Sequence, residues 1–320
     1  MIPKAELHVH LEGTAPPGLV RRIAARNGIQ IPAGLFDSSE RFAYSDFLDF
    51  LRTYDLAASV IRTGDDYRDV TYEYLAACAR DGAIYVELTA SPDHAALVGL
   101  SDEEHLDGIA RGIDDARRDH GIEARVLFSC VRNFGVERAL RVARDAAERP
   151  HPYVVGFSMA GDEEHYPARE YAEAFRVAAD AGLGCTVHAG EWAGADSVRA
   201  ALQLPVTRIS HGVRSIEDPA LVADLAERGI VLECCPTSNV VLGVFPSYEQ
   251  HPLPRLVAAG VRVTLGSDDP PYFGASVGGE YAICQERFGF DDDALVAITR
   301  TAIAAAFCEE SLKQALMQRV

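Results

Sequence analysis

The chain has 320 residues, of which 48% are hydrophobic, enough to bury one barrel-sized core or two smaller ones. Its formal net charge is −18 with no block of like charge, so we expect neither nucleic acid nor a membrane as a partner. The opening MIPKAELHVH contains no long apolar run, and no stretch approaches the roughly 20 apolar residues of a membrane span. We therefore expect a cytoplasmic protein that acts on a small molecule.

Short runs rich in β-branched residues alternate with longer amphipathic segments along the whole chain. Eight runs are interpreted as strands: AELHVH (5–10), AIYVELTA (83–90), ARVLFSCV (124–131), VVGFSMA (154–160), GCTVHAG (184–190), TRISHGV (207–213), GIVLECC (229–235) and GVRVTLGS (260–267). This alternation predicts an α/β fold with a parallel sheet, and eight units predict a TIM-like (β/α)8 barrel in one domain, 1–320. A doubly wound open sheet is the alternative, but its GxGxxG motif is missing.

The first strand is followed by an unusually long connection, about 12–82, which we expect to form a helical insertion covering the pocket. Within it, YSDFLDFLRTYDLAASVI (44–61) predicts an amphipathic helix. Its apolar face includes Phe47, Leu48, Phe50 and Leu51. Packing into the core is the favoured interpretation of this face, and covering the mouth of a pocket is the alternative.

His8 and His10 stand two residues apart near the end of the first predicted strand. Side chains at i and i+2 of a strand point to the same face, so both imidazoles enter the barrel together. They are either a pair of metal ligands or two histidines satisfied by hydrogen bonds in the core. This pair alone does not decide between the two.

Other strand ends also carry polar side chains, where barrel enzymes keep their catalytic groups. They are His188 and Glu191 in VHAGE, His211 in ISHG, and Asp268 and Asp269 in SDDP. The three imidazoles of His8, His10 and His188, together with one carboxylate, suit zinc. Zinc takes nitrogen and oxygen donors, and in catalytic sites it leaves a position for water. Zinc lowers the pKa of that water from 15.7 toward about 7, and Glu191 and His211 are then candidate proton carriers.

The remaining histidines and polar segments are not expected to take part in catalysis. We expect six histidines to be solvated: His94, His105, His120, His151, His165 and His251. The segment GDEEH (161–165) is expected to be a solvated acidic loop, and ECCPTSN (233–239) to surround the pocket without taking part in catalysis.

The ordered set ELHVHLEG, AGDE, HAGE, SHGV, CPTSN and SDDP resembles the adenosine deaminase family of the metal-dependent amidohydrolases, over nearly the whole chain. The resemblance implies a TIM-like barrel with one zinc per chain, held by His8, His10, His188 and Asp268. It further implies that Glu191 protonates purine N1 and that His211 orients or deprotonates the attacking water. Asp269 would bond to N7, and the N–H of Gly161 would face N3. Because VVGFSMAG lacks a bridging lysine, one metal is expected.

Glu12 stands where members of this family often have an aspartate that binds the ribose 5′-hydroxyl. Together with Gly161, Asp269, Phe47 and Phe50, it forms the expected substrate-binding set. The favoured function is hydrolysis of adenosine, with 2′-deoxyadenosine, to inosine and ammonia in purine salvage. The alternative is deamination of adenine or of a modified adenine nucleoside, since a glutamate here also resembles the adenine-deaminating branch. A catalytically inactive ligand-binding barrel and a hydrolase of esters or phosphotriesters are weaker rivals, and no oligomeric state is predicted.

Overall fold

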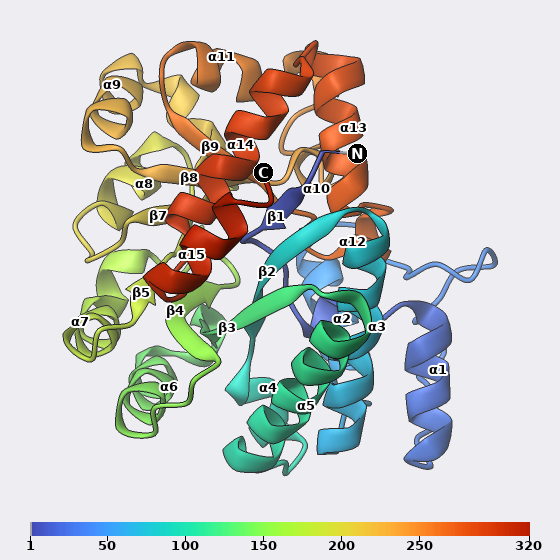
Figure 1. Ribbon diagram of the computed structural model, residues 1–320. Coiled ribbons are helices and arrows are strands. Elements are labelled where there is room, and N and C mark those ends of the chain that lie inside the picture. Colours follow the sequence, from blue (N-terminus) through green and yellow to red (C-terminus); the bar gives the residue numbers. More distant parts are fainter. Residues whose placement is uncertain (1) are drawn as a thin grey trace.

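Short parallel strands alternate with helices through the computed structural model, which describes residues 2–320 (Figure 1). The strands are β1 (Lys4–Glu6), β2 (Ala83–Ala90), β3 (Glu123–Val131), β4 (Val154–Ala160), β5 (Gly184–Cys185), β6 (His188–Ala189), β7 (Arg208–His211), β8 (Val231–Cys234) and β9 (Arg262–Leu265). The helices are α1 (Pro17–Arg26), α2 (Phe47–Ala58), α3 (Gly64–Arg80), α4 (Pro92–Leu97), α5 (Asp102–His120), α6 (Val136–Glu148), α7 (Ala172–Asp180), α8 (Ala195–Ala201), α9 (Pro219–Arg228), α10 (Pro236–Val241), α11 (Leu253–Ala258), α12 (Pro270–Phe273), α13 (Val277–Phe288), α14 (Asp292–Ala305) and α15 (Glu310–Met317).

The strands pair in chain order, β1 to β5 in one parallel sheet and β6 to β9 in another. The segment 184–190, expected as a single strand, forms β5 and β6 because its first half pairs with β4 and its second half with β7. Between them, the N–H of Thr186 donates to the carbonyl of Phe157 at 3.2 Å. At the other seam a parallel bridge joins Val9 to Asp268. The ladder thus curls into the predicted TIM-like barrel, with helices around it (Figure 1).

Local sequence signals set the ends of the helices that cover the barrel, as α9 illustrates. The Asp218 side chain accepts hydrogen bonds from the N–H groups of Ala220 and Leu221 at 3.0 and 3.2 Å. Pro219 occupies the first helical position, where its missing N–H costs nothing. Gly229 ends the helix with φ 66°, a conformation that glycine adopts without strain.

One buried arginine inside the barrel is paired with two buried carboxylates. Arg208, fully buried on β7, lies 2.6 Å from Glu87 Oε2 through Nη2 and 2.6 Å from Glu233 Oε1 through Nε. Both carboxylates are also buried. A buried charge without a partner is strongly destabilising, so these three residues are interdependent parts of the core.

The connection after β1 contains α1, α2 and α3, and α2 reaches the barrel mouth. The Asp46 carboxylate caps α2 by accepting a hydrogen bond from the N–H of Asp49 at 2.9 Å. Phe50 is buried against Phe273, with ring centroids 5.2 Å apart, and also lines the pocket, whereas Leu48 is 45% exposed. The apolar face of α2 therefore serves both as core and as pocket wall. Among residues 2–320, no helix combines the length and apolar character needed to cross a membrane.

Candidate active site

The polar side chains at the strand ends gather at one rim of the barrel. His8 and His10 lie beyond β1, where the chain runs beside the residues that follow β9. The N–H of His10 donates to the carbonyl of Asp268 at 3.0 Å, and the N–H of Asp268 donates to that of His8 at 3.2 Å. His188 begins β6 and His211 ends β7. Because the barrel strands are parallel, their carboxyl ends bring these residues together.

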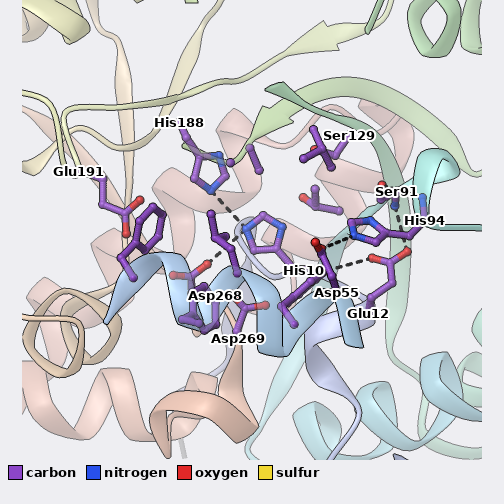
Figure 2. A pocket seen from close by; sticks show the side chains of 18 of the residues that line it. His10, Glu12, Asp55, Ser91, His94, Ser129, His188, Glu191, Asp268 and Asp269 are labelled. Carbon is purple, nitrogen blue, oxygen red and sulfur yellow. Dashed lines mark hydrogen bonds and ion pairs between the residues drawn. The ribbon is translucent and has the colours of Figure 1, made fainter. Parts of the chain in front are cut away.

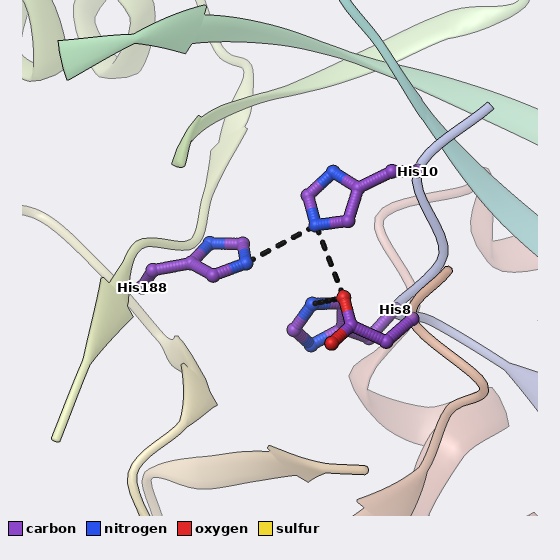
Figure 3. Close-up of side chains that lie close together, drawn as sticks. His8, His10 and His188 are labelled. Atoms are coloured by element: carbon purple, nitrogen blue, oxygen red, sulfur yellow. Dashed lines mark hydrogen bonds and ion pairs between the residues drawn. The ribbon is translucent and has the colours of Figure 1, made fainter. Parts of the chain in front are cut away.

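Four of these side chains converge with the spacing of metal ligands. His10 Nε2 lies 3.2 Å from His188 Nε2 and 3.3 Å from Asp268 Oδ1, and His8 Nε2 lies 3.4 Å from the same oxygen. Figure 3 shows the three imidazoles turned toward one carboxylate. Atoms about 2.0–2.2 Å from a tetrahedral zinc ion are separated from one another by roughly 3.3 Å. The observed separations match that value.

Hydrogen bonds behind the cluster orient the imidazoles. His8 Nδ1 lies 3.3 Å from the carbonyl of Glu233, and His188 Nδ1 lies 2.9 Å from that of Met159. A carbonyl only accepts, so each Nδ1 carries a hydrogen and each Nε2 turns its lone pair into the cluster. His8 Nε2 is buried and has no hydrogen-bond partner within residues 2–320. Burying the Nε2 lone pair of His8 without a partner costs free energy unless a bound ligand satisfies it. His8, His10, His188 and Asp268 therefore fit a metal ion.

Glu191 follows β6 in a loop that another carboxylate holds in place. Glu163 Oε2 accepts hydrogen bonds from the N–H groups of Glu191, Trp192 and Ala193 at 3.1, 2.9 and 3.2 Å, and its Oε1 accepts one from Gly190. Burial, with the charges of nearby carboxylates, raises the pKa of Glu191 well above its usual value. The expectation that GDEEH is a solvated loop is wrong for Glu163, which is buried because it turns inward to bind this second loop.

His211 and Asp268 share an uncommon backbone conformation. Their φ angles are 62° and 63°, in the left-handed region that residues with a Cβ rarely adopt. Such strain persists only where the surrounding structure enforces it, and it is frequent at functional sites. His211 Nε2 lies 3.6 Å from Glu191 Oε2 and 3.9 Å from Asp268 Oδ2. Burial lowers the pKa of His211 to about 3, so its ring is neutral.

A cavity of about 80 Å³ opens over the cluster. In Figure 2, Glu191 lies on one side of His10, and Glu12 lies on the other. Phe47 and Phe50 supply an apolar wall from α2. Gly161 also lines the cavity with φ 107°, and a Cβ there would come within 2.3 Å of a neighbouring side-chain oxygen. Only glycine fits at this position in the cavity wall.

Asp269 is buried at the edge of the same cavity, and its Oδ1 has no hydrogen-bond partner in the part of the chain that the structure describes. Gly13 makes this close packing possible, because a Cβ at residue 13 would lie 1.8 Å from that oxygen. Burial raises the pKa of Asp269 well above its usual value, although the His10 charge opposes the shift. Asp269 thus presents an unpartnered carboxyl oxygen at the cavity.

The carboxylate of Glu12 is buried and enclosed by protein donors. Tyr54 Oη lies 3.3 Å from Oε2, while Tyr67 Oη and the N–H of Ser91 lie 3.3 and 3.0 Å from Oε1. A hydroxyl beside a carboxylate donates, so these groups together supply three hydrogen bonds to Glu12. Its side chain is fixed by residues of α2, α3 and the loop after β2.

Three of the histidines expected to be solvated are buried instead: His94, His105 and His251. His94 Nε2 lies 2.9 Å from Asp55 Oδ1, and burial lowers the pKa of His105 to about 3. The expectation was wrong for these residues because the loop and helix-end positions of the sequence do not reveal which elements pack over them.

A parallel barrel whose rim presents three imidazoles and a carboxylate, with buried carboxyl groups around a small cavity, has the architecture of a metal-dependent amidohydrolase. The family model described as adenosine deaminase matches residues 3–320, and the chain belongs to this family.

Similar proteins cover the whole chain. The adenine deaminase of Chelativorans sp. (strain BNC1) is 50% identical over 321 residues, which span 100% of this chain and 98% of that protein. The crystal structure of adenine deaminase from Arthrobacter aurescens has a TM-score of 0.93 at 30% identity, covering 99% of this chain and 98% of that one. An amidohydrolase from Burkholderia ambifaria with bound Zn has a TM-score of 0.89 at 27% identity, covering 99% and 89%. The chain is therefore a deaminating hydrolase.

Proposed function

We propose that this chain hydrolyses adenine at C6 to give hypoxanthine and ammonia, a step of purine salvage. The observation that carries the choice of substrate is Glu12, whose carboxylate already accepts three hydrogen bonds from the protein. A carboxylate has roughly four acceptor positions, so these three bonds hold Glu12 in place and leave one position at most for a ribose hydroxyl. Full-length relatives named adenine deaminase support the same choice. These relatives favour deamination of adenine, the alternative expectation, over deamination of adenosine.

The metal in this proposal is one zinc ion per chain, held by His8, His10, His188 and Asp268. The converging donors and the buried, unpartnered His8 Nε2 support it, as does the zinc-bound relative from Burkholderia ambifaria. Zinc would supply Lewis acidity and bring the pKa of a water toward about 7. β4 contains no lysine to bridge a second metal.

Glu191 is the proposed proton donor to N1 of the base. Its raised pKa favours the protonated carboxyl group, which can give its proton to N1 as the ring loses aromaticity. Water then adds to C6, and the Glu191 carboxylate takes the proton that the water releases. The same carboxyl group passes that proton to the amino group, which leaves as ammonia when the C6–N bond breaks. The carboxylate then takes the remaining hydroxyl proton as the C6 carbonyl forms, which returns Glu191 to its protonated starting state.

Two further groups are proposed to fix the orientation of the ring. The raised pKa of Asp269 favours its protonated form, and a protonated carboxyl group can donate a hydrogen bond to N7. The N–H of Gly161 would donate to N3 from the opposite wall. Phe47 and Phe50 would cover a face of the purine. In this orientation the N9 edge faces Glu12.

The exchange Glu12→Asp tests why adenine is preferred. Shortening the side chain by one methylene withdraws the carboxylate from the N9 side of the pocket. We expect kcat/KM for adenosine to rise at least roughly tenfold relative to that for adenine, measured by ammonia release from zinc-loaded protein. Glu103→Asp makes the same change at an exposed position and should leave the ratio unaltered. An unchanged ratio in Glu12→Asp would contradict the role given to Glu12.

A further inference from the structure

A chain of buried side chains runs from the loop before α11 to His211. The N–H of Leu253 donates to His251 Nδ1 at 3.3 Å. His251 Nε2 lies 3.1 Å from Asn239 Oδ1, and Asn239 Nδ2 lies 3.2 Å from His211 Nδ1. All three side chains are buried, and neither Asn239 nor His251 lines the cavity.

The backbone N–H of Leu253 fixes the hydrogen positions along this series of hydrogen bonds. Because a backbone N–H only donates, His251 Nδ1 must accept, and the neutral ring carries its hydrogen on Nε2. That hydrogen needs an acceptor, so Asn239 presents its oxygen to His251 and its NH2 group to His211. His211 Nδ1 must then accept as well. A neutral His211 therefore carries its hydrogen on Nε2, the nitrogen nearest Glu191 and Asp268.

We propose that Asn239 and His251 are positioning residues that hold His211 in the Nε2–H tautomer, so that His211 donates a hydrogen bond to the attacking water and does not remove its proton. The inference rests on the proposed function and deepens it, because the family resemblance left both roles of His211 open. His211 turns its one acceptor nitrogen away from the reaction.

The distances around His211 agree with this role. Its Nε2 lies 3.6 Å from Glu191 Oε2 and 3.9 Å from Asp268 Oδ2, too far for direct hydrogen bonds but suited to a bridging water. As the water oxygen bonds to C6, one O–H bond breaks. The released proton goes to the Glu191 carboxylate, which has already given its own proton to N1. No further base is needed.

The tautomer can be measured without any substrate. Long-range ¹H–¹⁵N correlation spectra of the zinc-loaded protein show which nitrogen of each imidazole carries hydrogen, and His211→Gln and His251→Gln assign the two signals. We expect the hydrogen on Nε2 in both rings. Asn239→Asp replaces the amide donor with an acceptor and should move the His211 hydrogen to Nδ1. A wild-type His211 protonated on Nδ1 would overturn the proposal.

Kinetic variants separate positioning from a structural role. Asn239→Asp should lower kcat by roughly 10²- to 10⁴-fold, with KM and zinc content near those of the wild type. His251→Gln keeps an N–H donor toward Asn239 and should retain more activity than His251→Phe. Tyr248→Phe is the control, since it removes a 3.3 Å hydrogen bond to Thr237 on the same helix, α10, and should leave kcat unchanged.

The outcomes distinguish this inference from the choice of substrate. If Asn239→Asp lost zinc in parallel with kcat, Asn239 and His251 would have a structural role, and the positioning role would be refuted. If adenosine proved the better substrate, the spectra would still report the tautomer, because they use the protein without a purine.

Discussion

Glu163→Gln tests how the loop that carries Glu191 is held. The carboxylate accepts N–H groups from four consecutive residues, three of them at Oε2. A glutamine can place its amide oxygen where Oε2 accepts the three N–H groups. Its NH2 group then takes the place of Oε1 and faces the N–H of Gly190. One charge-assisted hydrogen bond is lost, and two donors are brought together. The loop must move to separate them.

The size of the effect follows from these contacts. A hydrogen bond to a charged group contributes about 1.5–3 kcal/mol, so we expect the free energy of unfolding to fall by about 2–3 kcal/mol. Displacement of Glu191 should lower kcat/KM for adenine by roughly 10- to 100-fold, because small misplacements of a catalytic group are costly. Thermal unfolding and steady-state kinetics measure the two losses. Zinc content should stay constant, since Glu163 binds the loop and none of the metal-cluster side chains.

Glu164, the next residue in the sequence, provides a matched control. Glu164 is exposed, so Glu164→Gln makes the same chemical change without touching the loop and should leave both quantities unaltered. If Glu163→Gln unfolded and turned over adenine as the wild type does, the reasoning from these hydrogen bonds would be refuted.

Three further predictions concern the metal, the proton donor and a buried acid. Elemental analysis should find close to one zinc per chain, reduced by Asp268→Ala; two metals per chain, both needed for activity, would contradict the mononuclear site. Glu191→Gln should keep zinc but lower kcat/KM by roughly 10²- to 10⁴-fold, and normal turnover would reassign N1 protonation. Burial raises the pKa of Glu280 to about 8, so between pH 4.5 and 8 the folded protein binds a proton that the unfolded chain has released. The free energy of unfolding should therefore fall as pH rises through this range, and Glu280→Gln should flatten the slope measured by urea titration.

The sequence predicted the barrel and the convergence of the four metal-cluster side chains for the same reason. Strands alternating with helices make a parallel barrel, and a parallel barrel brings all its strand ends to one rim. His8 and His10 share a face because they are two residues apart, whereas His188 and Asp268 lie at strand ends far along the chain. Their meeting could be predicted without knowing any distance.

The residues that support this cluster could not be predicted in the same way. An acidic loop is usually solvated, and Glu163 is buried only because the loop after β6 turns its N–H groups toward it. One signal was available, since Glu163 follows β4 by three residues and so belongs to the same rim. His251 follows no strand end, and its contact with Asn239 depends on how the loop before α11 folds back. Tertiary packing of this kind leaves no local pattern.

The proposed preference for adenine is tested by the ratio of kcat/KM for adenine to that for adenosine, measured on zinc-loaded protein with the products identified as hypoxanthine or inosine. The Glu12 carboxylate accepts three protein hydrogen bonds at the N9 side of the proposed orientation, and we expect a ribose on N9 to displace it from two of them. At about 1.5–3 kcal/mol for each bond to a charged group, the loss is at least about 3 kcal/mol, or roughly 10²-fold in rate. We predict a ratio of roughly 100 or more in favour of adenine. Equal or faster turnover of adenosine would show that Glu12 does not exclude the nucleoside.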